Sequence, residues 1–162
     1  MAREALFNIL FSARSLKEIG FDLHGANILD VCCGSGAVAF EALSRGAKSA
    51  TLLDNNRAHL ELARQNAVHL KVEDRVKVLQ QDAKKLGKNS DAFDLVFIDP
   101  PYREDYNSIV SSLVAQGWIQ KKSLVVIEYD RTSDLENISE FLKEVETRDY
   151  GKTSFKFLQL KN

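Results

Sequence analysis

The chain of 162 residues is long enough for one domain with a hydrophobic core. Its 22 basic and 23 acidic residues give a formal net charge of -1, which argues against a broad basic surface for nucleic acid, because such binding needs a surplus of lysine and arginine. Its 44% of hydrophobic residues argues against a disordered chain, and no apolar run approaches the roughly 20 residues that a membrane-spanning helix needs.

Apolar residues recur at helical and strand spacings in alternation along the chain. The first half predicts a helix over 4–19, a strand over 26–31, a helix over 37–45, a strand over 50–53, a helix over 57–70 and a strand over 76–79. The second half predicts a loop over 84–91, strand 93–98, helix 107–116, strand 124–129, helix 134–142 and a hairpin of strands 145–148 and 155–160. This alternation predicts a single α/β domain over residues 1–162 with a mostly parallel sheet.

The ends of the first two predicted strands carry residues suited to a ligand, which in an open α/β sheet binds outside the carboxyl ends of the strands. Gly34 and Gly36 remove side chains where the first strand turns into a helix, so a ligand can approach the backbone. A tight turn without a ligand explains these glycines equally well. Asp54 ends the second strand, and its carboxylate suits the ribose of NAD or of S-adenosylmethionine. Asn55 or Asn56 can cap the next helix, which leaves Asp54 free for the ligand.

The third and fourth strand ends add groups that can recognise a nucleobase. Asp82-Ala83 offers an acceptor for an adenine amino group and space for the ring. Asp99-Pro100-Pro101-Tyr102 is the more specific signal, because two prolines fix the backbone and withdraw two N–H donors. A flipped-out base could donate its amino hydrogens to Asp99 and the Pro100 carbonyl while Tyr102 stacks on the ring. The alternative is a simple proline turn that leaves a buried strand.

Taken together, these strand ends resemble those of class I S-adenosylmethionine-dependent methyltransferases, and the Asp-Pro-Pro-Tyr form marks the branch that methylates amino groups. Residues 3–10, residues 34–47 and Gly117-Trp118 are similar to the RsmD family of 16S ribosomal RNA guanine-N2 methyltransferases. The resemblance implies a Rossmann-like domain whose seven-stranded sheet has an antiparallel last strand and helices on both faces. It also implies methyl transfer from S-adenosylmethionine to N2 of a guanine in 16S rRNA, with S-adenosylhomocysteine as the product.

The resemblance and the strand ends together define the expected site. The residues expected to bind the cofactor are Asp30, Cys32, Gly34, Ser35, Gly36, Asp54, Asn55, Asp82, Ala83 and Asp99, and those expected at the reacting amino group are Asp99, Pro100, Pro101 and Tyr102. The residues expected to bind RNA are Arg3, Asn8, Arg14, Tyr102 and Arg103. A salt bridge on a helix face explains Arg3 and Arg14 almost as well. The chain starts close to the family's Arg-Glu motif, so we expect a short N-terminal helix and no separate RNA-binding arm.

Other functions share some of these features. An adenine-N6 methyltransferase would share residues 99–102 but would need a target-recognition insert, for which 162 residues leave no room. A nicotinamide oxidoreductase would share the glycines and Asp54 but does not explain the double proline. A non-catalytic ribosome assembly factor that binds S-adenosylmethionine and RNA would keep every cofactor position.

The remaining cysteine, histidine and lysine residues predict no further chemistry. Cys32 and Cys33 are adjacent, which disfavours a disulfide between them and fits a reducing cytoplasm. The three histidines have no partner at metal-ligand spacing, so we expect no metal. The lysines of the 84–91 loop are expected to be solvated. We expect a cytoplasmic monomer with no membrane contact, which acts on 16S rRNA within a small-subunit particle.

Overall fold

The computed structural model describes residues 2–100, 106–132, 135, 138 and 140–161. The helices are α1 (Ala2–Ser12), α2 (Arg14–Glu18), α3 (Ala37–Ser44), α4 (Arg57–His69) and α5 (Tyr106–Ala115), with a 3-10 turn η1 (Glu73–Arg75). The strands are β1 (Asn27–Val31), β2 (Ser49–Asp54), β3 (Val76–Gln80), β4 (Leu95–Ile98), β5 (Leu124–Asp130), β6 (Leu142–Tyr150) and β7 (Thr153–Leu160).

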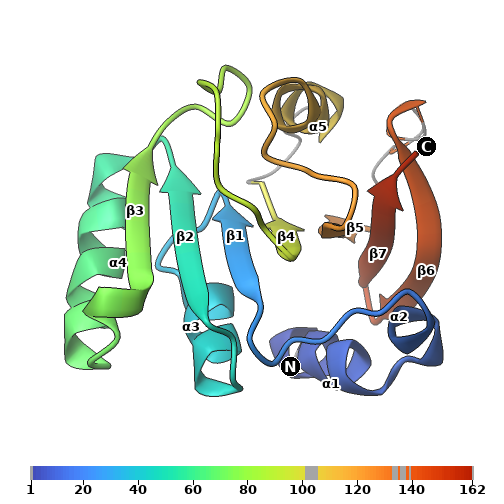
Figure 1. Cartoon of the computed structure of the whole chain (residues 1–162), viewed down its shortest axis with the longest axis horizontal. Helices are drawn as coiled ribbons and strands as arrows, with labels where there is room; N and C mark the ends of the chain where they lie inside the picture. The colour runs from blue at the N-terminus through green and yellow to red at the C-terminus, as the bar shows by residue number, and fades with distance from the viewer. Residues whose placement is uncertain (1, 101–105, 133–134, 136–137, 139, 162) are drawn as a thin grey trace.

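Within the described residues, seven strands form one twisted sheet in the order β3-β2-β1-β4-β5-β7-β6 (Figure 1). The pairs β1·β2, β2·β3, β1·β4 and β4·β5 are parallel. The last strand of the chain, β7, lies between β5 and β6 and is antiparallel to both. The predicted α/β class and the antiparallel last strand are therefore confirmed. The strand order reverses between β1 and β4, where an open sheet of this kind binds its ligands.

Successive residues of the central strands point to opposite faces of the sheet, so each strand contributes to two hydrophobic cores. On one face, Ile28 of β1 and Leu52 of β2 pack in a core with buried residues of α1, α2, α3 and α4. On the other face, Leu29 of β1 and Val96 of β4 pack with α5, Trp118 and Ile119. Helices thus cover both faces, as predicted, and β4 is apolar along its whole length, as expected of a strand buried on both sides.

The N-terminal helix expected over 4–19 is two helices instead of one. Ala13 has a ψ of 124°, which is outside the helical region and separates α1 from α2. The break redirects α2 toward β6, where the Ser15 hydroxyl donates a hydrogen bond to Glu146. Both helices bury an apolar face, which is why the spacing of apolar residues does not reveal the break.

The C-terminal part also differs from the prediction. Of the helix expected over 134–142, residues 134, 136, 137 and 139 lie outside the described residues, none of the described residues is in an α-helix, and Leu142 begins strand β6. Strand β6 extends well beyond the predicted 145–148 because it pairs with β7 along its length, with a register shift between Glu144 and Glu146. Among the described residues, no helix is long and apolar enough to cross a membrane.

The long connection between β3 and β4 is anchored to the body of the protein. Trp118 stacks on Phe93 with ring centroids 6.2 Å apart, and its indole nitrogen donates to the Gly87 carbonyl at 2.8 Å. The Asn89 side-chain amide donates to the Gly117 carbonyl at 3.0 Å. These contacts fix a segment rich in polar residues that periodicity alone predicts only as a loop. They also hold the backbone that follows β3 beside the sheet edge where the strands end.

Candidate active site

A cavity of about 860 Å³ lies at the carboxyl ends of the central strands. Its walls come from the loop after β1, the end of β2, the segments after β3 and β4, the end of β5 and the turn between β6 and β7. Of the residues predicted to bind a cofactor, those that line it are Cys32, Gly34, Asp54, Asn55, Asp82, Ala83 and Asp99. The structure therefore brings together residues from four strand ends that are separated by up to 67 positions in the sequence.

The glycine loop after β1 has a left-handed backbone at alternate residues. Cys32, Gly34 and Gly36 have φ values of 59°, 56° and 87°. A Cβ atom added to Gly34 would meet nothing within 4 Å, so this glycine leaves the cavity wall open. A Cβ atom on Gly36 would lie 2.6 Å from the Leu52 side chain and 2.7 Å from the Phe40 ring. Close packing between the loop and the core thus leaves no space for a side chain at Gly36. This residue does not line the cavity.

Asp54 joins this loop to β2. One carboxylate oxygen accepts the Gly34 N–H at 2.9 Å, and the other accepts the Asn56 N–H at 2.9 Å. The His59 ring nitrogen Nδ1 lies 3.3 Å from the first oxygen. Asn56 caps α4 by accepting the His59 N–H at 3.1 Å, as predicted. Asp54 is therefore not the helix cap, and although two backbone N–H groups bond to its carboxylate, each oxygen can accept a further hydrogen bond from a ligand.

Asp30 and Cys33 are buried beside the loop and do not line the cavity. Asp30 is 3% exposed, and no described residue donates to its Oδ2 atom. Burial raises the pKa of Asp30 well above its ordinary value, and a hydrogen bond from the Ala39 N–H offsets only part of this effect. Burial also raises the pKa of the Cys33 thiol, which therefore stays protonated and is not a nucleophile.

Two carboxyl groups meet at the end of β4 and β5. Asp99 follows β4 and is hydrogen-bonded to Glu128 of β5. Burial in the cavity wall raises the pKa of Asp99, and the hydrogen bond from Glu128 opposes this effect. Pro100 is buried and lines the cavity beside them. The other three residues predicted here, Pro101, Tyr102 and Arg103, lie outside the described residues.

Of the residues predicted to bind RNA, the three that the structure describes, Arg3, Asn8 and Arg14, do not line the cavity. The Arg3 side chain lies 3.9 Å from Glu41, and the Arg14 side chain lies 3.3 Å from Glu18. Both arginines thus make the helix salt bridges that the sequence offered as an alternative. Asn8 is exposed on α1, where its carbonyl accepts the Ser12 hydroxyl at 2.6 Å. Arg3 lines a separate groove of about 480 Å³ that also contains Ser35.

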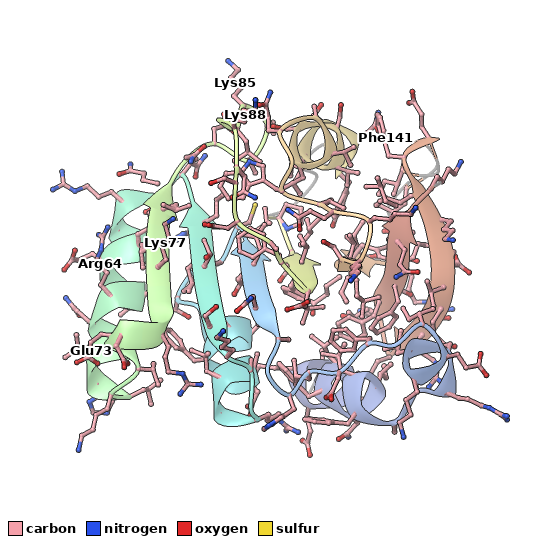
Figure 2. The ribbon with its side chains drawn as sticks, in the orientation of Figure 1. Arg64, Glu73, Lys77, Lys85, Lys88 and Phe141 are labelled. Atoms are coloured by element: carbon pink, nitrogen blue, oxygen red, sulfur yellow. The ribbon has the colours of Figure 1, made fainter. Side chains whose placement is uncertain are left out.

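The lysine-rich loop after β3 lies at the same end of the sheet as the cavity. Figure 2 shows Lys85 pointing outward at the tip of this loop, with Lys88 nearby, and both are exposed. Asp82 turns the chain into the loop by accepting the Lys84 N–H at 2.9 Å. Lys85 and Lys88 do not line the cavity, which agrees with the predicted solvated loop, whereas Lys84 of the same loop is exposed and lines the cavity.

Sequence reasoning missed several residues of the cavity wall. Tyr106 and His59 enter it from helices α5 and α4, Glu128 from β5 and Lys152 from the turn between β6 and β7. Only Glu128 carries a signal in the sequence, because it follows four apolar residues in an otherwise buried strand. A carboxylate at that position is costly unless it has a partner or keeps its proton.

Comparison with known proteins gives consistent matches. The family model described as Conserved hypothetical protein 95 matches residues 1–159. Ribosomal RNA small subunit methyltransferase D of Haemophilus influenzae is 31% identical over 138 residues, covering 82% of this chain and 67% of that protein. The protein of the same name from Escherichia coli is 32% identical over 83% of this chain, which spans 62% of that protein's length. The solved structure of Escherichia coli yhhF superposes with a TM-score of 0.80 at 27% identity, covering 99% of this chain and 86% of that one.

Proposed function

This chain belongs to the RsmD family of methyltransferases, described as Conserved hypothetical protein 95, and we propose that it methylates the exocyclic amino group N2 of a guanine in 16S rRNA. It is a class I methyltransferase that acts on ribosomal RNA. The observation that supports methylation of an amino group is Asp99 at the cavity wall, beside Pro100 and bonded to Glu128. The Asp99 carboxylate and the Pro100 carbonyl are acceptors that suit a donor with two hydrogens, such as an exocyclic amino group, and the choice of guanine N2 rests on the family resemblance.

The methyl donor is S-adenosylmethionine, and the residues of the cavity fit it. The volume of about 860 Å³ is within the range of cofactor sites. Gly34 presents backbone without a side chain at the cavity wall, and Asp54 and Asp82 present carboxylates suited to ribose hydroxyls and to an adenine amino group. When bound, the cofactor supplies an electrophilic methyl group.

The protein's own groups act mainly by orientation and by accepting protons. The Asp99 carboxylate and the Pro100 carbonyl accept the two hydrogens of the base amino group, which directs the nitrogen lone pair away from both. Tyr102 is proposed to stack on the base. Asp99 Oδ then takes the proton that the nitrogen loses once it carries the methyl group. No strong base is required, so near-attack geometry and the placed negative charge provide most of the acceleration.

The proposed partner is 16S rRNA within a small-subunit particle in the cytoplasm, with the protein acting as a monomer. A net charge of -1 and the pairing of Arg3 and Arg14 with carboxylates support weak, salt-dependent binding to free RNA. A surface of the particle would then provide part of the docking contact. Tight, salt-insensitive binding to bare RNA would contradict this part of the proposal.

The deciding experiment supplies a tritiated methyl donor with free 16S rRNA or with 30S particles from cells that lack the gene. Mass mapping of the product should find N2-methylguanosine at one position. N6-methyladenosine instead would support the adenine-N6 alternative. Incorporation into neither RNA, with S-adenosylhomocysteine still bound by calorimetry, would support the non-catalytic assembly factor.

A further inference from the structure

Glu128 is the residue opposite Asp99 across the β4–β5 pair. The two strands are parallel, with Ile98 in register with Ile127, so Asp99 and Glu128 are the next residues on each. Both side chains line the cavity and are hydrogen-bonded to each other. A hydrogen bond between two carboxyl groups requires that one of them be protonated, because an ionised carboxylate only accepts. The register and the common cavity wall thus place the two carboxyl groups where they can hold one proton between them at a pH below the Glu128 pKa of about 7.

The surroundings decide which carboxyl keeps the proton. Burial, and next the charge of Asp99, raise the pKa of Glu128 to about 7. The hydrogen bond from Glu128 acts on Asp99 in the opposite direction and favours its charged form. The proton thus resides on Glu128 and the negative charge on Asp99.

The other titratable groups around the pair leave this assignment unchanged. The Tyr106 hydroxyl of α5 donates to the Glu128 backbone carbonyl at 3.4 Å. Burial, Asp99 and Glu128 raise the pKa of Tyr106 to about 12, so this phenol stays neutral. Asp130 and Cys32 line the same cavity, and Lys152 is the cation contributed by the hairpin turn. The acidic neighbours disfavour a second negative charge on the pair.

We propose that Glu128 is a positioning residue for Asp99: its protonated carboxyl donates to one Asp99 oxygen and leaves the other for the amino group of the target base. This inference deepens the proposed function and rests on it. Without the donor, Asp99 can rotate, and the acceptor geometry at the reacting nitrogen is lost. When Glu128 ionises, two adjacent negative charges repel each other and move Asp99 in the same way.

Kinetics of two substitutions test the role. Glu128→Ala should lower kcat roughly 10- to 100-fold, with the KM for RNA and the affinity for S-adenosylhomocysteine within about twofold of wild type. Glu128→Gln keeps a donor that cannot ionise, so its kcat at pH 6 should be within about threefold of wild type, and the fall in kcat above pH 7 should disappear. Glu144→Gln removes an exposed carboxylate of β6, paired with Lys156, and should leave the pH profile unchanged.

A titration of the ligand-free protein gives a readout that does not depend on activity. In side-chain carboxyl 13C NMR, Glu128 should titrate near pH 7, and Asp99→Asn should move that midpoint to lower pH. A Glu128 midpoint at its ordinary value, or a Gln variant as impaired as the Ala variant, would overturn the proposal. Wild-type methylation of a base other than guanine would instead overturn the proposed function and leave the titration result standing.

Discussion

We expect removal of the Asp99 side chain to affect catalysis far more than cofactor binding. Its carboxylate lies beside Pro100 and Glu128, whereas Asp54 ends β2, which is separated from β4 by β1 in the sheet. Asp99→Ala should lower kcat about 10²- to 10³-fold, the usual effect of removing one preorganised electrostatic group. Affinity for S-adenosylhomocysteine, measured by calorimetry, should change far less. Asp74→Ala, at an exposed position of η1, is the control. Equal losses of turnover and cofactor affinity would refute this assignment.

The two glycines of the loop should respond differently to the same substitution. Gly34→Ala places a methyl group in open space at a φ of 56°, which costs about 1 kcal/mol of backbone strain. Gly36→Ala adds a Cβ atom 2.6 Å from Leu52 and should destabilise the fold by roughly 2–4 kcal/mol. Urea unfolding should show the larger loss for Gly36→Ala. Calorimetry should show the larger relative loss of S-adenosylhomocysteine affinity for Gly34→Ala, and the reverse ranking would contradict the division of roles.

At the scale of elements, the β6–β7 hairpin provides more than an edge to the sheet. Its turn places the exposed Lys152 at the cavity, beside Asp130 and Thr132. We predict that Lys152 contacts an RNA phosphate near the target base. Lys152→Gln should weaken binding of RNA and reduce the slope of log affinity against log salt by about one. Lys143→Gln removes an exposed lysine of the same hairpin, on β6, and serves as the matched control. Identical salt slopes for the two variants would rule out the contact.

For the whole molecule, the acidic groups make stability depend on pH in two separate windows. Exposed carboxylates such as Glu144, whose pKa a hydrogen bond from Lys156 lowers, stabilise the fold above their unfolded pKa and lose this effect only in acid. Glu128 has a raised pKa, so its contribution is complete below the unfolded pKa of 4.5 and disappears as the pH rises through about 7.

Urea unfolding of wild type and Glu128→Gln between about pH 5 and pH 8 tests the second window. Wild type should lose stability on the order of 2–3 kcal/mol relative to the variant over this range, because ionisation of Glu128 is unfavourable only in the folded state. Parallel stability curves for the two proteins would show that Glu128 ionises normally when folded. The result is independent of the substrate because no ligand is present.

The α/β class, the succession of strands along the chain and the acidic and glycine residues at the strand ends follow from the sequence by itself. These features depend on the spacing of apolar and polar residues within each segment, and that spacing can be read directly from the sequence. The break at Ala13 and the full extent of β6 depend on packing and pairing with distant segments, so periodicity did not reveal them. Only the tertiary structure decided that Gly36 packs on Leu52 and that Asp54 binds the Gly34 N–H. The Asp99–Glu128 pair was likewise decided only by the tertiary structure. These residues are 29 positions apart in the sequence, and the register of two parallel strands brings them together. No local sequence pattern encodes that register.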